Sequence, residues 1–218
     1  MFIVTKDIFG TPLEGTDGRV GAFYDVLFDD RSWKVRHLVV STERRFHRRQ
    51  VLIDPEMVQQ AEWSSRKVRV RLSDEQVRQC PSSDTDLPVA RQERPESAQV
   101  LVSEAYWIGA LKGSSNVGGE AHLRSARLLG GLHIHCPDGR LGHVEDFIVD
   151  DETWCVRYLV VDTRNWWPGK RVLIEPTFVE SIRWEEREIH LALARDQIER
   201  RPAYEGAVPS EEPVLGTA

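Results

Sequence analysis

The sequence has few cysteines, and the three that it has lie far apart. Cys80, Cys136 and Cys155 form no CxxC pair, and an odd number cannot all pair within one chain. These absences argue against a disulfide-stapled secreted fold and against a zinc ribbon. We therefore expect free thiols in a reducing compartment, and the cytoplasm is the simplest location.

Long apolar runs are missing too. No stretch approaches the roughly 18 uncharged apolar residues that a membrane-spanning helix needs. The first ten residues, MFIVTKDIFG, lack the charged segment and long apolar run of a secretory signal. We expect neither a membrane span nor a leader peptide.

Positive charge is not in excess: 29 Lys and Arg face 35 Asp and Glu, which gives a formal net charge of -6. Nucleic-acid binding needs cationic side chains that displace counterions, so nucleic acid is not the expected partner. The GxSxG, Walker, GxGxxG and HExxH motifs are absent as well. We expect a protein that is not an enzyme and that has no cofactor.

The strongest feature that is present is an internal duplication with an offset of 121 residues. About 25 of the 72 positions from Gly10 to Pro81 are identical to their counterparts in 131–202. The identical positions include the two tryptophans Trp33 and Trp154. Solenoid repeats are only about 20–50 residues long, so each copy is predicted to be a complete small domain.

This duplication predicts four parts. A first domain spans 1–81, a linker with a possible short helix spans 82–125, a second domain spans 126–202, and a flexible tail spans 203–218. The linker begins with the polar, proline-containing run SSDTDLPVARQERPES. Domains this small are marginally stable alone, so we expect the halves to pack on each other or on another copy, as a homo-oligomer.

Each copy has the pattern of short strands joined by turns. In the first copy the strands are predicted at Val20–Phe28, Trp33–Val40, Val51–Ile53 and Val68–Leu72, and the second copy repeats them 121 residues later. Ser73 with Gln76 fits a capping box at the start of a closing helical turn. The predicted fold class is all-β: two small tandem barrels, each ending in a short helical turn, with an irregular linker.

The run DGRLGHVEDFIVDDETWCVRYLVVDTRNWWPGKRVLIEP (138–176) and its partner DGRVGAFYDVLFDDRSWKVRHLVVSTERRFHRRQVLIDP (17–55) resemble the PRC-barrel. That domain occurs in the cytoplasmic part of the photosynthetic reaction-centre H subunit and in the C-terminal half of a bacterial ribosome-maturation factor. The resemblance covers both copies, and its signature is structural. It implies no shared catalytic residues and a role in docking or assembly. The membrane helix of the reaction-centre subunit has no counterpart here. The maturation factor has a different domain ahead of its barrel, and in this chain a second barrel stands in that place.

Several repeated charged residues have a structural interpretation. Asp29-Asp30 and Asp150-Asp151 follow a strand, and we interpret them as turn formers that face water. An aspartate also occurs in the middle of a strand in each copy, and a buried aspartate must be paired. We predict ion pairs across the hairpin, which join Asp25 to Arg36 and Asp146 to Arg157.

A group of metal-binding residue types occurs in the second copy only. His133, His135, Cys136 and His143 lie close in sequence, and the two histidines of a His-x-His strand share one face. The facing positions of the first copy hold other residue types, and no fourth ligand has metal-site spacing. We predict no metal site, and we rank an enzyme or metal protein built on this cluster as the third hypothesis.

Two loops are the predicted contact surface. The first runs from Arg44 to Arg49 and contains four arginines: Arg44, Arg45, Arg48 and Arg49. The second runs from Asn165 to Lys170 and contains Trp166 and Trp167. Trp166 and Trp167 either pack against a neighbouring domain or are exposed for binding. As a contact surface, the two loops are suited to another protein, which is the expected partner. The alternative is a factor that binds nucleic acid or an anionic ligand through the arginine loop.

Overall fold

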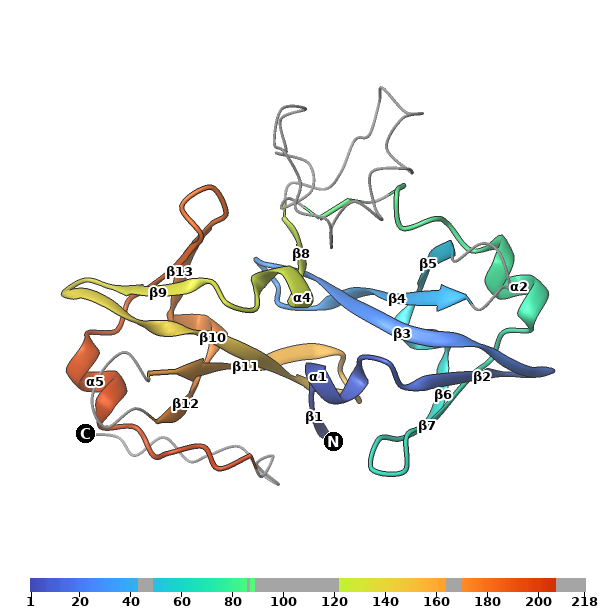
Figure 1. Ribbon diagram of the computed structural model, residues 1–218, viewed down its shortest axis with the longest axis horizontal. Helices are drawn as coiled ribbons and strands as arrows, with labels where there is room; N and C mark the ends of the chain where they lie inside the picture. The colour runs from blue at the N-terminus through green and yellow to red at the C-terminus, as the bar shows by residue number, and fades with distance from the viewer. Residues whose placement is uncertain (43–48, 86, 89–121, 164–169, 207–218) are drawn as a thin grey trace, which may run out of the picture.

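The computed structural model describes residues 1–42, 49–85, 87–88, 122–163 and 170–206. These residues form two β units of the same design, which lie side by side (Figure 1). The prediction of an all-β fold is confirmed. The possible helix in the linker, and both predicted contact loops except for Arg49 and Lys170, fall outside the described residues.

Each unit is a curved sheet with a short closing helix. The first unit contains β2 (Pro12–Gly15), β3 (Gly18–Asp29), β4 (Val35–Thr42), β5 (Arg49–Ile53), η1 (Pro55–Met57), β6 (Val58–Glu62), β7 (Lys67–Val70) and α2 (Asp74–Gln79). The second unit contains β9 (His133–Cys136), β10 (Gly139–Asp150), β11 (Cys155–Asp162), β12 (Arg171–Ile174), η3 (Pro176–Phe178), β13 (Val179–Arg183), β14 (Glu188–Leu191) and α5 (Arg195–Glu199).

The two sheets have the same strand order. It runs β5-β4-β3-β2-β7-β6 in the first unit and β12-β11-β10-β9-β14-β13 in the second. Within each path only β2 with β7, and β9 with β14, pair in parallel, and the other neighbours are antiparallel. In the described part of the chain no pairing joins the two ends of either path, so each barrel wraps around its core without a closed ladder.

Local sequence explains most of these elements. Asp29 ends β3 because its carboxylate accepts hydrogen bonds from the backbone N–H groups of Arg31 and Ser32, at 3.0 and 2.8 Å. Helix α2 begins with the predicted capping box, in which Ser73 accepts from the Gln76 backbone and Gln76 from the Ser73 backbone. Asp150 forms the equivalent turn in the second unit, but it is buried there, so the interpretation that this residue faces water is wrong.

The two units exchange their first strands. Strand β1 (Phe2–Val4) and helix α1 (Thr5–Ile8) precede the first unit, yet β1 pairs with β10 of the second. In return β8 (Leu123–Ser125), which is followed by α4 (Ala126–Leu129), pairs with β3 of the first unit. In Figure 1 the exchange is visible where β8 crosses to β3 and where β1 lies below β10 and β11. Strand β8 lies in the stretch predicted to be linker.

The exchange joins the two cores. One continuous cluster of buried side chains contains residues of both units, from Ile3 to Ile198. Within it the ring centroids of Phe28, from the first unit, and Phe147, from the second, lie 5.4 Å apart. The backbone N–H of Val35 also donates to the Trp154 carbonyl at 2.7 Å, and that of Val156 to the Trp33 carbonyl at 2.8 Å. The expectation that the halves pack on each other is therefore confirmed.

The segments after each closing helix also attach to the sheets. The backbone N–H of Ser83 donates to the Gln50 carbonyl at 3.0 Å, and that of Tyr204 donates to the Arg171 carbonyl at 2.8 Å. Ser83 and Tyr204 are equivalent under the 121-residue offset, as are Gln50 and Arg171. Each repeat therefore extends beyond Pro81 and Pro202, and the first residues of the predicted linker and tail are part of the fold.

Candidate functional site

Arg49 is the one arginine of the predicted basic loop that the structure describes. Its guanidinium donates to the carbonyls of Arg78 and Cys80, at 2.8 and 3.3 Å, at the end of α2. The ammonium of Lys170, its counterpart, donates to the carbonyls of Glu199 and Arg201 at 2.5 Å each. These four carbonyls are equivalent in the two repeats. Both cations therefore satisfy the C-terminus of the closing helix, which gives Arg49 a structural role. Arg44, Arg45, Arg48, Trp166 and Trp167 lie outside the described residues.

The register of the two hairpins does not place the predicted ion-pair partners opposite one another. The register places Asp25 opposite Val39 and Asp146 opposite Val160, three residues beyond the predicted arginines. Arg157 donates to Asp150 at 3.3 Å. The prediction that joins Asp25 to Arg36 and Asp146 to Arg157 is therefore wrong, because β-bulges shift the register of both hairpins.

The two buried aspartates instead hold the exchanged segments. Asp25 accepts hydrogen bonds from the Ser125 hydroxyl at 2.5 Å and from the Arg127 backbone N–H at 3.1 Å. Asp146 accepts from the Thr5 hydroxyl, and Oδ2 of Asp146 lies 3.9 Å from the Lys6 ammonium. Each aspartate thus binds the start of the short helix that the other repeat contributes, which accounts for its presence in both copies.

Asp146 gives a prediction about pH. Burial raises the pKa of Asp146, although the bonds from Thr5 and from the Phe147 backbone act against this shift. A carboxyl with a raised folded pKa stabilises the fold below its unfolded pKa, and this contribution is lost as the pH rises through the folded pKa. Asp146→Asn removes the titration and keeps an acceptor for Thr5. We expect the stability of the variant relative to the parent to increase as the pH rises from acid to neutral, because only the parent loses stability over this range.

Chemical unfolding of parent and variant across this range measures the difference directly. Asp146→Ala is the control, because it also removes the titration but leaves the Thr5 hydroxyl without its acceptor. That loss costs about 1–3 kcal/mol at every pH. A constant difference between the Asn variant and the parent from acid to neutral pH would contradict the prediction.

The predicted histidine and cysteine cluster is not assembled as a unit. Cys136 is fully buried in the core, and burial raises the pKa of its thiol to about 11. His133 is exposed, and His143 is its partner in the register between β9 and β10. Only His135 meets further groups with metal-binding chemistry.

The group around His135 comes from two strands that are distant in sequence. Strand β14 pairs in parallel with β9, and His190 is the register partner of His135. Their rings stack with centroids 4.5 Å apart. Glu188 Oε2 lies 3.1 Å from His190 Nε2 and 3.7 Å from His135 Nδ1. We call His135, Glu188 and His190 the histidine–glutamate cluster.

Arg140 fixes the charge of this cluster. Its Nε and Nη2 atoms donate to Glu188 Oε1 at 2.9 and 2.5 Å. Burial would raise the pKa of Glu188, but the hydrogen bonds and charge of Arg140, together with His190, lower it overall. Glu188 is therefore a buried carboxylate with one oxygen held by Arg140 and the other turned to the two imidazoles.

Sequence reasoning missed Glu188 and His190 because they lie more than 50 residues after His135. The pattern Glu-x-His in β14 does mirror His-x-His in β9, and both place alternate residues on one face. Only the parallel pairing between these strands shows that the two patterns are neighbours.

The equivalent place in the first unit has a different chemistry. His135 corresponds to Glu14, Glu188 to Lys67, and His190 to Arg69. Arg69 Nε lies 3.3 Å from Glu14 Oε2, which is an exposed ion pair. A surface hollow of about 170 Å³ is lined here by Gln60, Glu62, Lys67 and Arg69. The cluster of the second unit is therefore not part of the shared framework.

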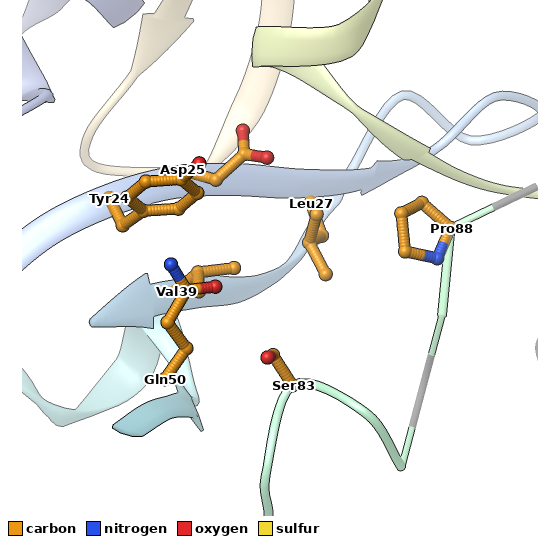
Figure 2. A pocket seen from close by; sticks show the side chains of 7 residues that line it. All are labelled: Tyr24, Asp25, Leu27, Val39, Gln50, Ser83 and Pro88. Carbon is orange, nitrogen blue, oxygen red and sulfur yellow. The ribbon is translucent and has the colours of Figure 1, made fainter. Parts of the chain in front are cut away.

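A second hollow lies on the outer face of the first unit. Figure 2 shows the residues that line it: Tyr24, Asp25, Leu27, Val39, Gln50, Ser83 and Pro88. It encloses about 10 Å³, which is room for about one water molecule. Its walls are mainly apolar, so the hollow is a packing gap beneath the segment after α2 and not a substrate site.

The fold and these sites define a tandem small-barrel protein whose two units share a core. Residues 134–197, from β9 to α5, match the family model of the PRC-barrel domain. This range omits β1 and β8, the strands that the units exchange. A search of curated proteins found no match to the chain. Among the helices of the described residues, none is long and apolar enough to cross a membrane.

Proposed function

We propose that the chain is a non-enzymatic docking module that presents two linked barrels to another protein. The match to the PRC-barrel family indicates a protein-interaction module. The observation that carries the proposal further is the strand exchange. It joins the barrels through one core, so surfaces on both barrels keep a constant relative position. A binding partner can then contact both units without the entropy cost of fixing their relative orientation.

The described surface is compatible with this role. Met1 is the one exposed large hydrophobic residue across the described ranges. We place the apolar part of the docking surface on Trp166 and Trp167, which lie outside those ranges. The three cysteines are free thiols, in keeping with a proposed location in the cytoplasm.

The second candidate is a factor that binds nucleic acid or an anionic ligand through the arginine loop. The net charge of -6 disfavours it. Arg49 also donates both of its described bonds to the end of α2. Three arginines of the loop remain for this function: Arg44, Arg45 and Arg48.

Capture of partners from the native cell extract on the tagged protein tests the proposal. The tag is then removed, and the complex is cross-linked to identify the contact surface. We expect a partner that binds the parent chain and is lost when Trp166 and Trp167 are both changed to Ala. Arg200→Ala is a matched surface control, because Arg200 is exposed and its ion pair is with Asp196 on its own helix. Loss of the partner in the Arg200→Ala control as well would contradict the proposed contact through the two tryptophans. Salt-dependent RNA binding that disappears in the Arg44, Arg45 and Arg48 triple alanine variant would contradict the proposal and support the second candidate.

A further inference from the structure

We infer that the histidine–glutamate cluster of the second unit binds a divalent transition metal ion of the zinc class. This inference is independent of the docking function. It rests on the donor atoms that β9 and β14 bring together: His135 Nδ1, Glu188 Oε2 and His190 Nε2 lie within 4.8 Å of one another. Two imidazole nitrogens and one carboxylate oxygen are a common protein ligand set for zinc.

The distances suit such an ion. Zinc binds nitrogen and oxygen ligands at about 2.0–2.1 Å in tetrahedral geometry, which places ligand atoms roughly 3.3 Å apart. The separations from Glu188 Oε2 to His190 Nε2 and to His135 Nδ1, 3.1 and 3.7 Å, lie on either side of this value. Small side-chain rotations would bring all three atoms to bonding distance of a single ion.

One donor atom of the cluster lacks a partner. His135 Nδ1 is buried, and no hydrogen bond to it is found among the described residues. A buried polar atom without a partner costs free energy, and a metal ion would supply the missing interaction. His190 meets a second carboxylate, because Glu186 Oε2 lies 3.9 Å from its Nε2 atom. Arg183 donates to the same oxygen of Glu186 at 3.2 Å, so water is the expected fourth ligand.

Arg140 orients the Glu188 carboxylate and leaves the oxygen that faces the histidines free to bind the ion. Its guanidinium holds Glu188 Oε1 and leaves Oε2 directed at the histidines. Partners of this kind orient metal-binding carboxylates and are part of the site. The bound ion would link β9 to β14, the parallel pair of the second barrel, and would stabilise this unit in particular.

The first barrel provides an internal comparison. Its backbone has the same pairing of β2 with β7, but its side chains are Glu14, Lys67 and Arg69. Two cationic side chains cannot coordinate a cation. We therefore expect one metal ion per chain, bound in the second barrel.

Titration of the tag-free full-length protein with Zn²⁺, in competition with a chromophoric chelator, tests the inference. We expect one equivalent to bind and to raise the midpoint of thermal unfolding. His190→Ala and Glu188→Gln should each weaken Zn²⁺ binding by more than about 10-fold. Removal of a residue that only orients a ligand can already cost about 10-fold, and these two residues are ligands themselves. His133→Ala on β9 and His143→Ala on β10 are controls, because neither residue belongs to the cluster, and they should leave binding unchanged.

A gain-of-function variant keeps the test informative if loss of the cluster impairs folding. Glu14→His, Lys67→Glu and Arg69→His together build the same donor set in the first barrel, where Arg19 stands in the place of Arg140. We expect this variant to bind a second equivalent of Zn²⁺. The inference is overturned if the parent binds no Zn²⁺ at stoichiometric concentrations, or if His133→Ala abolishes binding as fully as His190→Ala.

Discussion

Produced as two separate polypeptides, 1–88 and 122–218, the protein is expected to assemble into a 1:1 complex with both barrels folded. Neither polypeptide should give a stable folded monomer alone. The reason is the strand exchange, because each barrel takes one strand and one short helix from the other repeat. The fragment 122–218 lacks β1 and α1, including the buried side chains of Ile3 and Ile8. Their burial contributes about 4 kcal/mol, a large part of the 5–15 kcal/mol that stabilises a typical domain.

Co-expression and light scattering measure the assembly, and circular dichroism of each purified fragment measures its folding. Ile8→Ala in the fragment 1–88 is a useful variant, because Ile8 is fully buried and its loss should weaken the complex by about 2–5 kcal/mol. A stable monomer of 122–218 with a cooperative unfolding transition would show that the exchanged segment is dispensable.

Gly142→Ala is expected to destabilise the protein by about 4 kcal/mol. Gly142 has a φ of +64°, and a Cβ atom there would overlap the Asp162 carbonyl oxygen and lie 2.8 Å from the Asp162 carbonyl carbon. The left-handed conformation costs a non-glycine residue roughly 1–2 kcal/mol. Displacement of β11 away from β10 adds about 1–3 kcal/mol, as other overpacked sites do.

Gly131→Ala separates the two contributions. Gly131 also has a positive φ, +87°, but nothing lies within 4 Å of a Cβ atom built on it. We expect the unfolding free energy of this control to fall by only about 1–2 kcal/mol, which is the cost of the left-handed backbone conformation alone. Urea unfolding of both variants measures the loss of unfolding free energy in each. Equal losses would mean that the close approach of β10 to β11 adds no cost to a side chain at Gly142.

Much of the secondary structure of one barrel could be predicted from the sequence, because strands, turns and helix caps depend on residues that are close along the chain. Alternating side chains predict the strands, Asp-Gly dipeptides predict the turns, and Ser73 with Gln76 predicts the cap of α2. The identity between the repeats shows which positions maintain the backbone. The same method cannot give the register of a bulged hairpin, and the partners of Asp25 and Asp146 were wrong for that reason.

Only His135 of the histidine–glutamate cluster was singled out from the sequence, where we predicted no metal site. His135 belongs to a visible His-x-His pattern, but Cys136, its neighbour in sequence, points into the core because side chains of a strand alternate. Glu188 and His190 replace it as partners through a parallel pairing, which needs a long crossover and leaves no spacing rule in the sequence.

The sequence by itself determined the duplication, the all-β character of each copy and the turns and caps that bound its strands, because these follow from side-chain patterns within a few residues. Only the tertiary structure decided which sheet each first strand joins. The segments Phe2–Ile8 and Leu123–Leu129 have no identical residue in common at the 121-residue offset, so the comparison of the repeats does not show which barrel each one joins. Their place depends on a core shared between the two units and on two buried aspartates that each bind a helix of the other repeat. Contacts across 100 residues or more leave no local pattern in the sequence.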